Sequence, residues 1–129
     1  MSKFPSMAWF KTGLQKANDD PEFRKLGTCD AKVGVKVGNQ VFALAFDAFS
    51  VSSATKITQD DLRDLDFYID MPRADWDSFL ASLNGDEPVS LNSLDLRSGI
   101  VKSFDEARRV TFPRYHLTFQ RFFTAAATP

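Results

Sequence analysis

Residues 31–46, AKVGVKVGNQVFALAF, constrain the fold of this chain more than any other segment, because they have the pattern of a β-hairpin. The first seven residues alternate between apolar side chains and lysine or glycine, the period of two expected of a half-buried strand. Gly38 and Asn39 suit a two-residue turn, since both residue types tolerate positive φ. This turn sets a register that ends with Ala31 opposite Phe46, and one face of the hairpin is then large and apolar.

The opposite face of the hairpin carries small and basic side chains: Lys32, Gly34, Lys36, Val41, Ala43 and Ala45. Small side chains allow either a closely packed covering layer or space for an apolar ligand. The sequence leaves both alternatives open.

Two helices are expected before the hairpin. An apolar stripe with helical spacing predicts the first one, and it consists of Met7, Phe10, Leu14 and Ala17. Pro21 suits the first turn of a second, short helix, with Asp20 as its N-cap and Phe23 and Leu26 facing inward.

Strands and helices are also expected after the hairpin. The predicted strands are 51–57, polar enough to lie near a sheet edge, 65–69, and 93–102, bent at Gly99. One helix begins at Met71-Pro72 and ends at Asn84-Gly85, and another covers 112–126. The pattern of residues 104–110 favours no single element. Together these elements predict one α+β domain over residues 1–129, with an antiparallel-rich sheet between helices.

The thirteen phenylalanines are the unusual feature of the composition. They fit a heavy core, a lined hydrophobic cavity or an aromatic surface for a partner. Phe119, Phe122 and Phe123 nearly surround one short helix, which favours a partner or a second copy that covers some of them.

Charge and cysteine content exclude several classes of protein. The net charge of −1 favours neither nucleic-acid binding nor binding to an anionic membrane. No apolar run reaches the length of a membrane span, and the N-terminus has no signal-peptide pattern. With one cysteine, Cys29, no intramolecular disulfide can form, so we expect a reducing compartment, the cytoplasm.

The two signs of charge are separated along the chain. Residues 60–77 contain seven aspartates and two arginines, and residues 97–121 contain six basic and two acidic residues. These regions either pair weakly across the fold or form a bipolar surface for an oligomer or a partner protein.

Catalytic chemistry has little support in the sequence. His116 is the single histidine, and it lies within the predicted C-terminal helix. One histidine and one cysteine make a nucleophilic triad or a metal site improbable, and no glycine-rich phosphate loop is present. We therefore predict no catalytic residue, no metal and no cofactor.

The segments KVGVKVGNQVFALAFDAFSV and LDFYIDMPRADWDSFLASLNGDE resemble the sterol-carrier-protein family of lipid-transfer domains. The resemblance covers about Ala31 to Glu87, and its helix motif falls on Asp75, Trp76, Phe79, Leu80 and Gly85. It implies a five-stranded sheet with helices on one side, and an apolar ligand between them or a role beside an enzyme. The chain departs from the family pattern after Asn84, so a cavity or docking groove is implied rather than sterol binding itself.

Our leading hypothesis is a non-catalytic domain that holds a lipid or acyl-like ligand or acts as a small accessory subunit on a partner protein. The residues expected to line its pocket are Trp76, Phe79, Leu83, Phe119, Phe123, Phe42 and Phe46. The rival hypothesis is a small enzyme of the ketosteroid-isomerase type, in which an aspartate in an apolar pocket is the base. Its candidate residues are Asp47 or Asp66 as base and Tyr68 or Tyr115 as hydrogen-bond donor.

Overall fold

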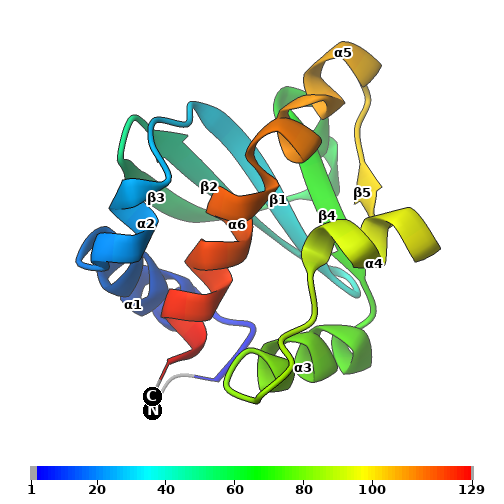
Figure 1. Ribbon diagram of the computed structural model, residues 1–129. Coiled ribbons are helices and arrows are strands. Elements are labelled where there is room, and N and C mark those ends of the chain that lie inside the picture. Colours follow the sequence, from blue (N-terminus) through cyan, green and yellow to red (C-terminus); the bar gives the residue numbers. More distant parts are fainter. Residues whose placement is uncertain (1–2, 129) are drawn as a thin grey trace.

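Five strands form one sheet in the computed structural model, which describes residues 3–128 (Figure 1). They are β1 (Ala31–Val37), β2 (Gln40–Asp47), β3 (Ser50–Ile57), β4 (Phe67–Met71) and β5 (Val101–Lys102), in the order β3-β2-β1-β4-β5. β1 and β4 run parallel, whereas the other neighbouring pairs are antiparallel. The predicted α+β fold with a mostly antiparallel five-stranded sheet is confirmed.

The central hairpin has the predicted turn and register. Gly38 has a φ of +60°, and Ala31 lies opposite Phe46. The predicted edge position of the third strand is also confirmed, because β3 is the outermost strand next to β2. The side-chain amide of Asn18 accepts from the Val51 N–H at 2.7 Å and donates to the Val51 carbonyl at 3.0 Å. Asn18 thus occupies backbone groups that an added strand would otherwise use.

The helices lie on one face of the sheet (Figure 1). They are α1 (Met7–Asn18), α2 (Pro21–Lys25), α3 (Arg73–Ser82), α4 (Leu91–Ser98), α5 (Glu106–Arg109) and α6 (Thr111–Ala127). Short polar side chains begin several of them: the side chains of Ser6, Asp20 and Ser90 each accept from a backbone N–H of the first turn. The opposite face is covered in part by a short 3₁₀ helix, η1 (Gln59–Asp64).

The predictions for residues 93–102 and for Leu26 are wrong. Residues 93–102 do not form a strand; most of them belong to α4, and β5 contains two residues. Ser90 caps this helix and Gly99 ends it with a φ of +62°, a conformation that glycine adopts at little cost. Leu26 does not face inward, because it follows the end of α2 and is 40% exposed.

Aromatic side chains dominate the core between the sheet and the helices. All of the thirteen phenylalanines except Phe49 and Phe104 are buried. Phe119, Phe122 and Phe123 are each at most 1% exposed, so the prediction that one domain leaves part of this set uncovered is wrong. α6 can bury three phenylalanines because α1, α3 and the sheet surround it.

The second face of the hairpin is closely covered around Gly34. A Cβ at this position would lie 2.6 Å from the Cβ of Tyr68 and 2.7 Å from the Cδ1 of Leu65. Leu62, from η1, packs in the same small cluster with Val41. The sequence left open a packed covering layer or space for an apolar ligand on this face. Around Gly34 the packed layer is present.

Candidate functional site

An apolar groove between α3 and α4 is the best candidate for a ligand site. Its volume is about 210 Å³. Its apolar lining consists of Met71, Phe79, Val89, Leu94 and Ile100, and its polar lining consists of Asp75, Ser78, Arg97 and Ser98. An apolar interior with a few polar groups is the usual composition of a small-molecule site.

The groove leads to the aromatic core through Phe79. The rings of Trp76, Phe79 and Phe123 contact each other, with centroid separations of 5.3–6.0 Å. Trp76 is fully buried, and its Nε1–H donates to the carbonyl of Lys36 at 2.8 Å, which fixes the ring against β1. A ligand in the groove would meet the edge of this three-ring cluster, which we call the aromatic cluster.

The structure places all seven predicted site residues in the hydrophobic core. Trp76, Phe79 and Phe123 form the aromatic cluster, whereas Phe46 and Phe119 contact each other at 5.1 Å elsewhere in the core. Phe42 packs on Phe10, with centroids 4.6 Å apart, and Leu83 is buried after the end of α3. Of the seven, Phe79 lines the groove.

The α4 side of the groove was not found from the sequence. Val89, Leu94 and Ile100 line it, and all three flank or belong to the segment that strand-like alternation misassigned. The signals that could have found this wall are the helix cap Ser90, the apolar pair Leu91 and Leu94, and the terminating Gly99.

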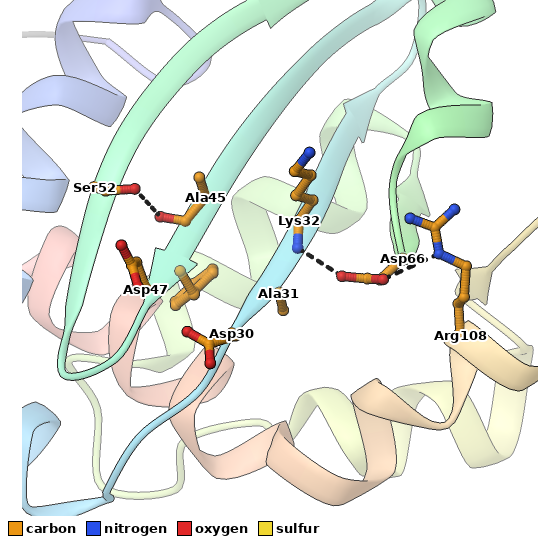
Figure 2. A pocket seen from close by; sticks show the side chains of 9 residues that line it. Asp30, Ala31, Lys32, Ala45, Asp47, Ser52, Asp66 and Arg108 are labelled. Atoms are coloured by element: carbon orange, nitrogen blue, oxygen red, sulfur yellow. Dashed lines mark hydrogen bonds and ion pairs between the residues drawn. The ribbon is translucent and has the colours of Figure 1, made fainter.

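A second, charged pocket of about 410 Å³ lies at the end of β1 and β2 (Figure 2). Its lining includes the aspartates Asp30, Asp47 and Asp66 and the basic residues Lys32 and Arg108. Asp30 accepts from the Ala48 N–H at 3.0 Å, and this contact holds the turn between β2 and β3. Within residues 3–128, no cluster of histidine, cysteine and acidic side chains is arranged to hold a metal ion.

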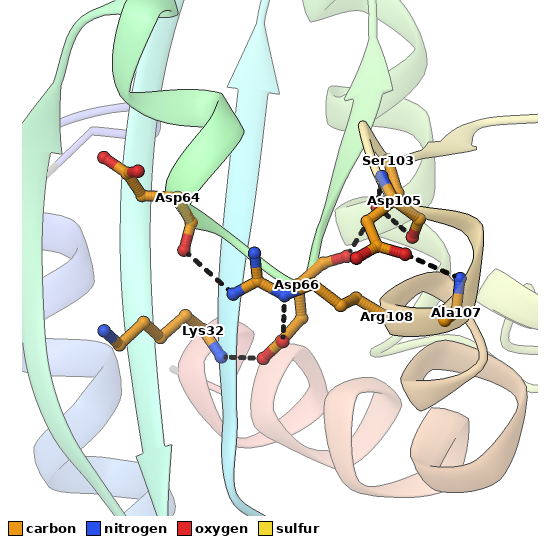
Figure 3. Close-up of polar contacts among 7 residues, drawn as sticks. All are labelled: Lys32, Asp64, Asp66, Ser103, Asp105, Ala107 and Arg108. Carbon is orange, nitrogen blue, oxygen red and sulfur yellow. Dashed lines mark hydrogen bonds and ion pairs between the residues drawn. The ribbon is translucent and has the colours of Figure 1, made fainter.

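In this pocket, Asp66 connects β1 with α5 through its hydrogen bonds (Figure 3). Its carboxylate accepts from the Lys32 N–H at 2.8 Å and from the Arg108 Nε at 3.2 Å, and its carbonyl lies 2.7 Å from the Ser103 hydroxyl. Asp105 caps α5 by accepting from the Ala107 N–H at 2.9 Å. These contacts fasten α5 to β1 and to the start of β4.

The residues of the rival enzyme hypothesis do not form the arrangement that it needs. Asp47 is exposed, and both carboxylate oxygens of Asp66 accept hydrogen bonds. Tyr68 packs in the cluster beneath η1, whereas Tyr115 packs on the core at the other face of the sheet. These four residues therefore do not place an aspartate beside a tyrosine in an apolar pocket.

The acidic and basic regions of the sequence meet in the fold. Arg108 pairs with Asp66 at 3.2 Å, and Lys102 pairs with Asp70 at 3.0 Å. Asp70 also holds the pKa of the Lys102 ammonium above its ordinary value through this hydrogen bond. Pairing across the fold, the first of the two alternatives, is thus present at both sites.

Comparison with known proteins identifies the fold. No family model and no curated protein matches the sequence. The structure is similar to the crystal structure of sterol carrier protein 2, with a TM-score of 0.76 and 17% sequence identity over 97% of this chain and 98% of that chain. The chain therefore has a sterol-carrier-like fold, as the resemblance of residues 31–87 implied. Within residues 3–128, no helix is sufficiently long and apolar to span a membrane.

Proposed function

From this fold and the groove between α3 and α4, we propose that the protein binds the alkyl chain of a lipid or acyl-like ligand without catalysing its reaction. The observation that carries the proposal is the apolar groove whose floor, Phe79, joins the aromatic cluster. Sterol carrier protein 2, to which the fold is similar, is by its name a carrier of sterols.

The size of the groove favours a chain over a ring system. Its 210 Å³ lies below the range of about 300–1,000 Å³ typical of sites for drug-sized ligands. A narrow alkyl chain can enter such a space end-on, whereas a fused ring system needs a wider opening. Phe79 would contact the chain first, and Trp76 and Phe123 lie directly behind it. Contact with Leu83, Phe42, Phe46 and Phe119 stays a prediction.

A fluorescent fatty acid without rings, cis-parinaric acid, tests the proposal. We expect saturable binding by the wild type and an affinity at least about tenfold weaker for Ser78→Phe, because the new ring fills the groove. Ala81→Phe is the matched control, since it adds the same ring to an exposed position of α3 that does not line the groove. Equal binding by both variants, or no binding by the wild type, would contradict the proposal.

A second candidate function is that of a small accessory subunit. Its support is the exposure of Leu96 on α4 and Leu117 on α6, at 79% and 59%. We expect the wild type, but not the double variant Leu96→Glu and Leu117→Glu, to retain a partner chain on purification from its native host. Light scattering of the purified protein then distinguishes a second copy from a different chain. A monomer that retains no other chain would contradict this role.

A further inference from the structure

α4 forms the outer wall of the groove and has one fully buried side chain of its own. Leu91 is the fully buried side chain of α4, Leu94 is half-buried and Leu96 is 79% exposed. Residues 84–88, before α4, are exposed and belong to no helix or strand. Gly99, directly after α4, has a left-handed backbone. α4 is therefore flanked by two points at which the chain can bend.

The N-terminal end of α4 is held by Gln120 of α6. The Gln120 side chain accepts from the Leu91 N–H at 2.8 Å and donates to the Val89 carbonyl at 2.9 Å. Because Leu91 is also fully buried, this end combines apolar and polar attachment. It has the properties of a pivot.

The C-terminal end of α4 is held by polar contacts of Asp95 and by Ile100, which is buried and whose carbonyl accepts from the Asp70 N–H at 2.8 Å. The Asp95 carboxylate accepts from the Arg109 Nη2 at 2.7 Å and from the Val101 N–H at 2.9 Å. Arg109 lies on α5, whose neighbouring residue Arg108 is fastened to Asp66 (Figure 3). The ion pair therefore joins α4 to a helix that is fastened to the sheet.

We propose that α4 is a lid over the aromatic cluster, with its pivot at Gln120 and its latch at the Asp95–Arg109 ion pair. Release of the latch lets α4 move away from α3, and this movement widens the groove above Phe79. This inference rests on the proposed function, since it gives a chain too large for the 210 Å³ groove access to Trp76 and Phe123.

Hydrogen exchange of the ligand-free full chain, read by mass spectrometry, tests the lid. Arg109→Gln removes the latch, and we expect amides of residues 91–98 to exchange about tenfold faster while amides of β1 and β2 are unchanged. Arg121→Gln is the matched control, because Arg121 and Arg109 are both 35% exposed and pair with aspartates that are 12% and 9% exposed. We expect the control to leave the exchange of residues 91–98 unchanged.

A second readout reports on the aromatic cluster itself. The chain has two tryptophans, so Trp9→Phe leaves Trp76 as the single fluorophore. In this background we expect acrylamide to quench Trp76 more strongly after Arg109→Gln, but not after Arg121→Gln. If Arg109→Gln unfolds the protein, Asp95→Asn removes the charge and keeps an acceptor for the Val101 N–H.

The lid would be overturned if residues 91–98 exchanged at the wild-type rate without the latch, or accelerated only together with β1 and β2. Neither experiment contains a ligand. Failure of the fatty-acid probe to bind therefore contradicts the proposed function but does not affect the test of lid opening.

Discussion

Gly34 of β1 lies opposite Tyr68 of the neighbouring strand β4 and beneath Leu65, which follows η1. Its missing Cβ leaves room for Tyr68 and Leu65, which would lie 2.6 and 2.7 Å from it. We expect Gly34→Ala to lower the free energy of unfolding by about 2 kcal/mol, because the Cβ of Tyr68 moves only with its backbone. Urea denaturation measures this loss. Gly85→Ala is the control, since its Cβ would lie 3.4 Å from the nearest atom, the carbonyl oxygen of Ser82. An equal loss in both variants would contradict the packing explanation, because Gly→Ala stabilises a compatible position through the entropy of the unfolded chain.

Cys29 illustrates a residue whose environment suppresses its chemistry. Burial, with smaller contributions from Asp30 and Asp66, raises the pKa of its thiol to about 12. At pH 8 the thiolate fraction is then very small, and the side chain is 2% exposed. We expect Ellman's reagent to label the native protein at pH 8 at least about a hundredfold more slowly than the protein in 6 M guanidinium chloride. Labelling of the folded protein at the unfolded rate would contradict this burial.

At the scale of the elements, α1 and α6 approach each other through small residues. A Cβ on Gly13 would lie 2.8 Å from the Cβ of Ala126. Gly13→Ala gains about 1 kcal/mol of helix propensity, but we expect a net loss of about 1–2 kcal/mol from this contact. Ala126→Gly in the same chain should restore part of the loss. A double-mutant cycle measures the coupling, and a value near zero would show that the loss does not arise from contact between residues 13 and 126.

The sequence predicted those elements whose local residues give both the periodicity and the turn or cap that ends the element. The hairpin was predicted to the exact register because alternation and a Gly-Asn turn agree, and α2 was predicted from its cap and proline. α4 was missed because SLDLRSGIVK alternates like a strand, whereas its burial is determined by tertiary contacts of Leu91 and Gln120. The parallel pairing of β1 with β4 is likewise a long-range property that no local pattern encodes.

At the scale of the whole molecule, the sequence predicted an aromatic core but not the groove between α3 and α4. Phenylalanine content indicated a large aromatic interior, and three of the seven residues expected to line a pocket, Trp76, Phe79 and Phe123, contact each other. Their contact with a ligand stays a prediction. The groove could not be predicted because α4, which forms one of its walls, was expected to be a strand. From the sequence, the acidic and basic regions could either pair with each other or form a bipolar surface. In the fold, some of these residues form ion pairs between elements, such as Arg108–Asp66.

One such ion pair joins the N-terminal and C-terminal parts of the chain, because Asp20 at the start of α2 pairs with Arg121 of α6. The hydrogen bond from Arg121 is the main reason that the pKa of Asp20 lies below its ordinary value of 3.8. Asp20 also caps α2 by accepting from the Glu22 N–H at 3.1 Å. Asn retains this capping ability, so Asp20→Asn removes the charge and little else.

A carboxyl group with a lowered pKa stabilises the folded state above the pKa of the unfolded chain, and this contribution disappears as the pH falls through the lowered value. We therefore expect Asp20→Asn to cost about 1 kcal/mol at pH 7, and the difference from wild type to vanish between about pH 4 and pH 2. Urea denaturation at pH 7, 5, 3 and 2 measures it. A difference that stayed constant with pH would assign the loss to capping or packing, because only an ionised Asp20 can hold α2 to α6 through charge.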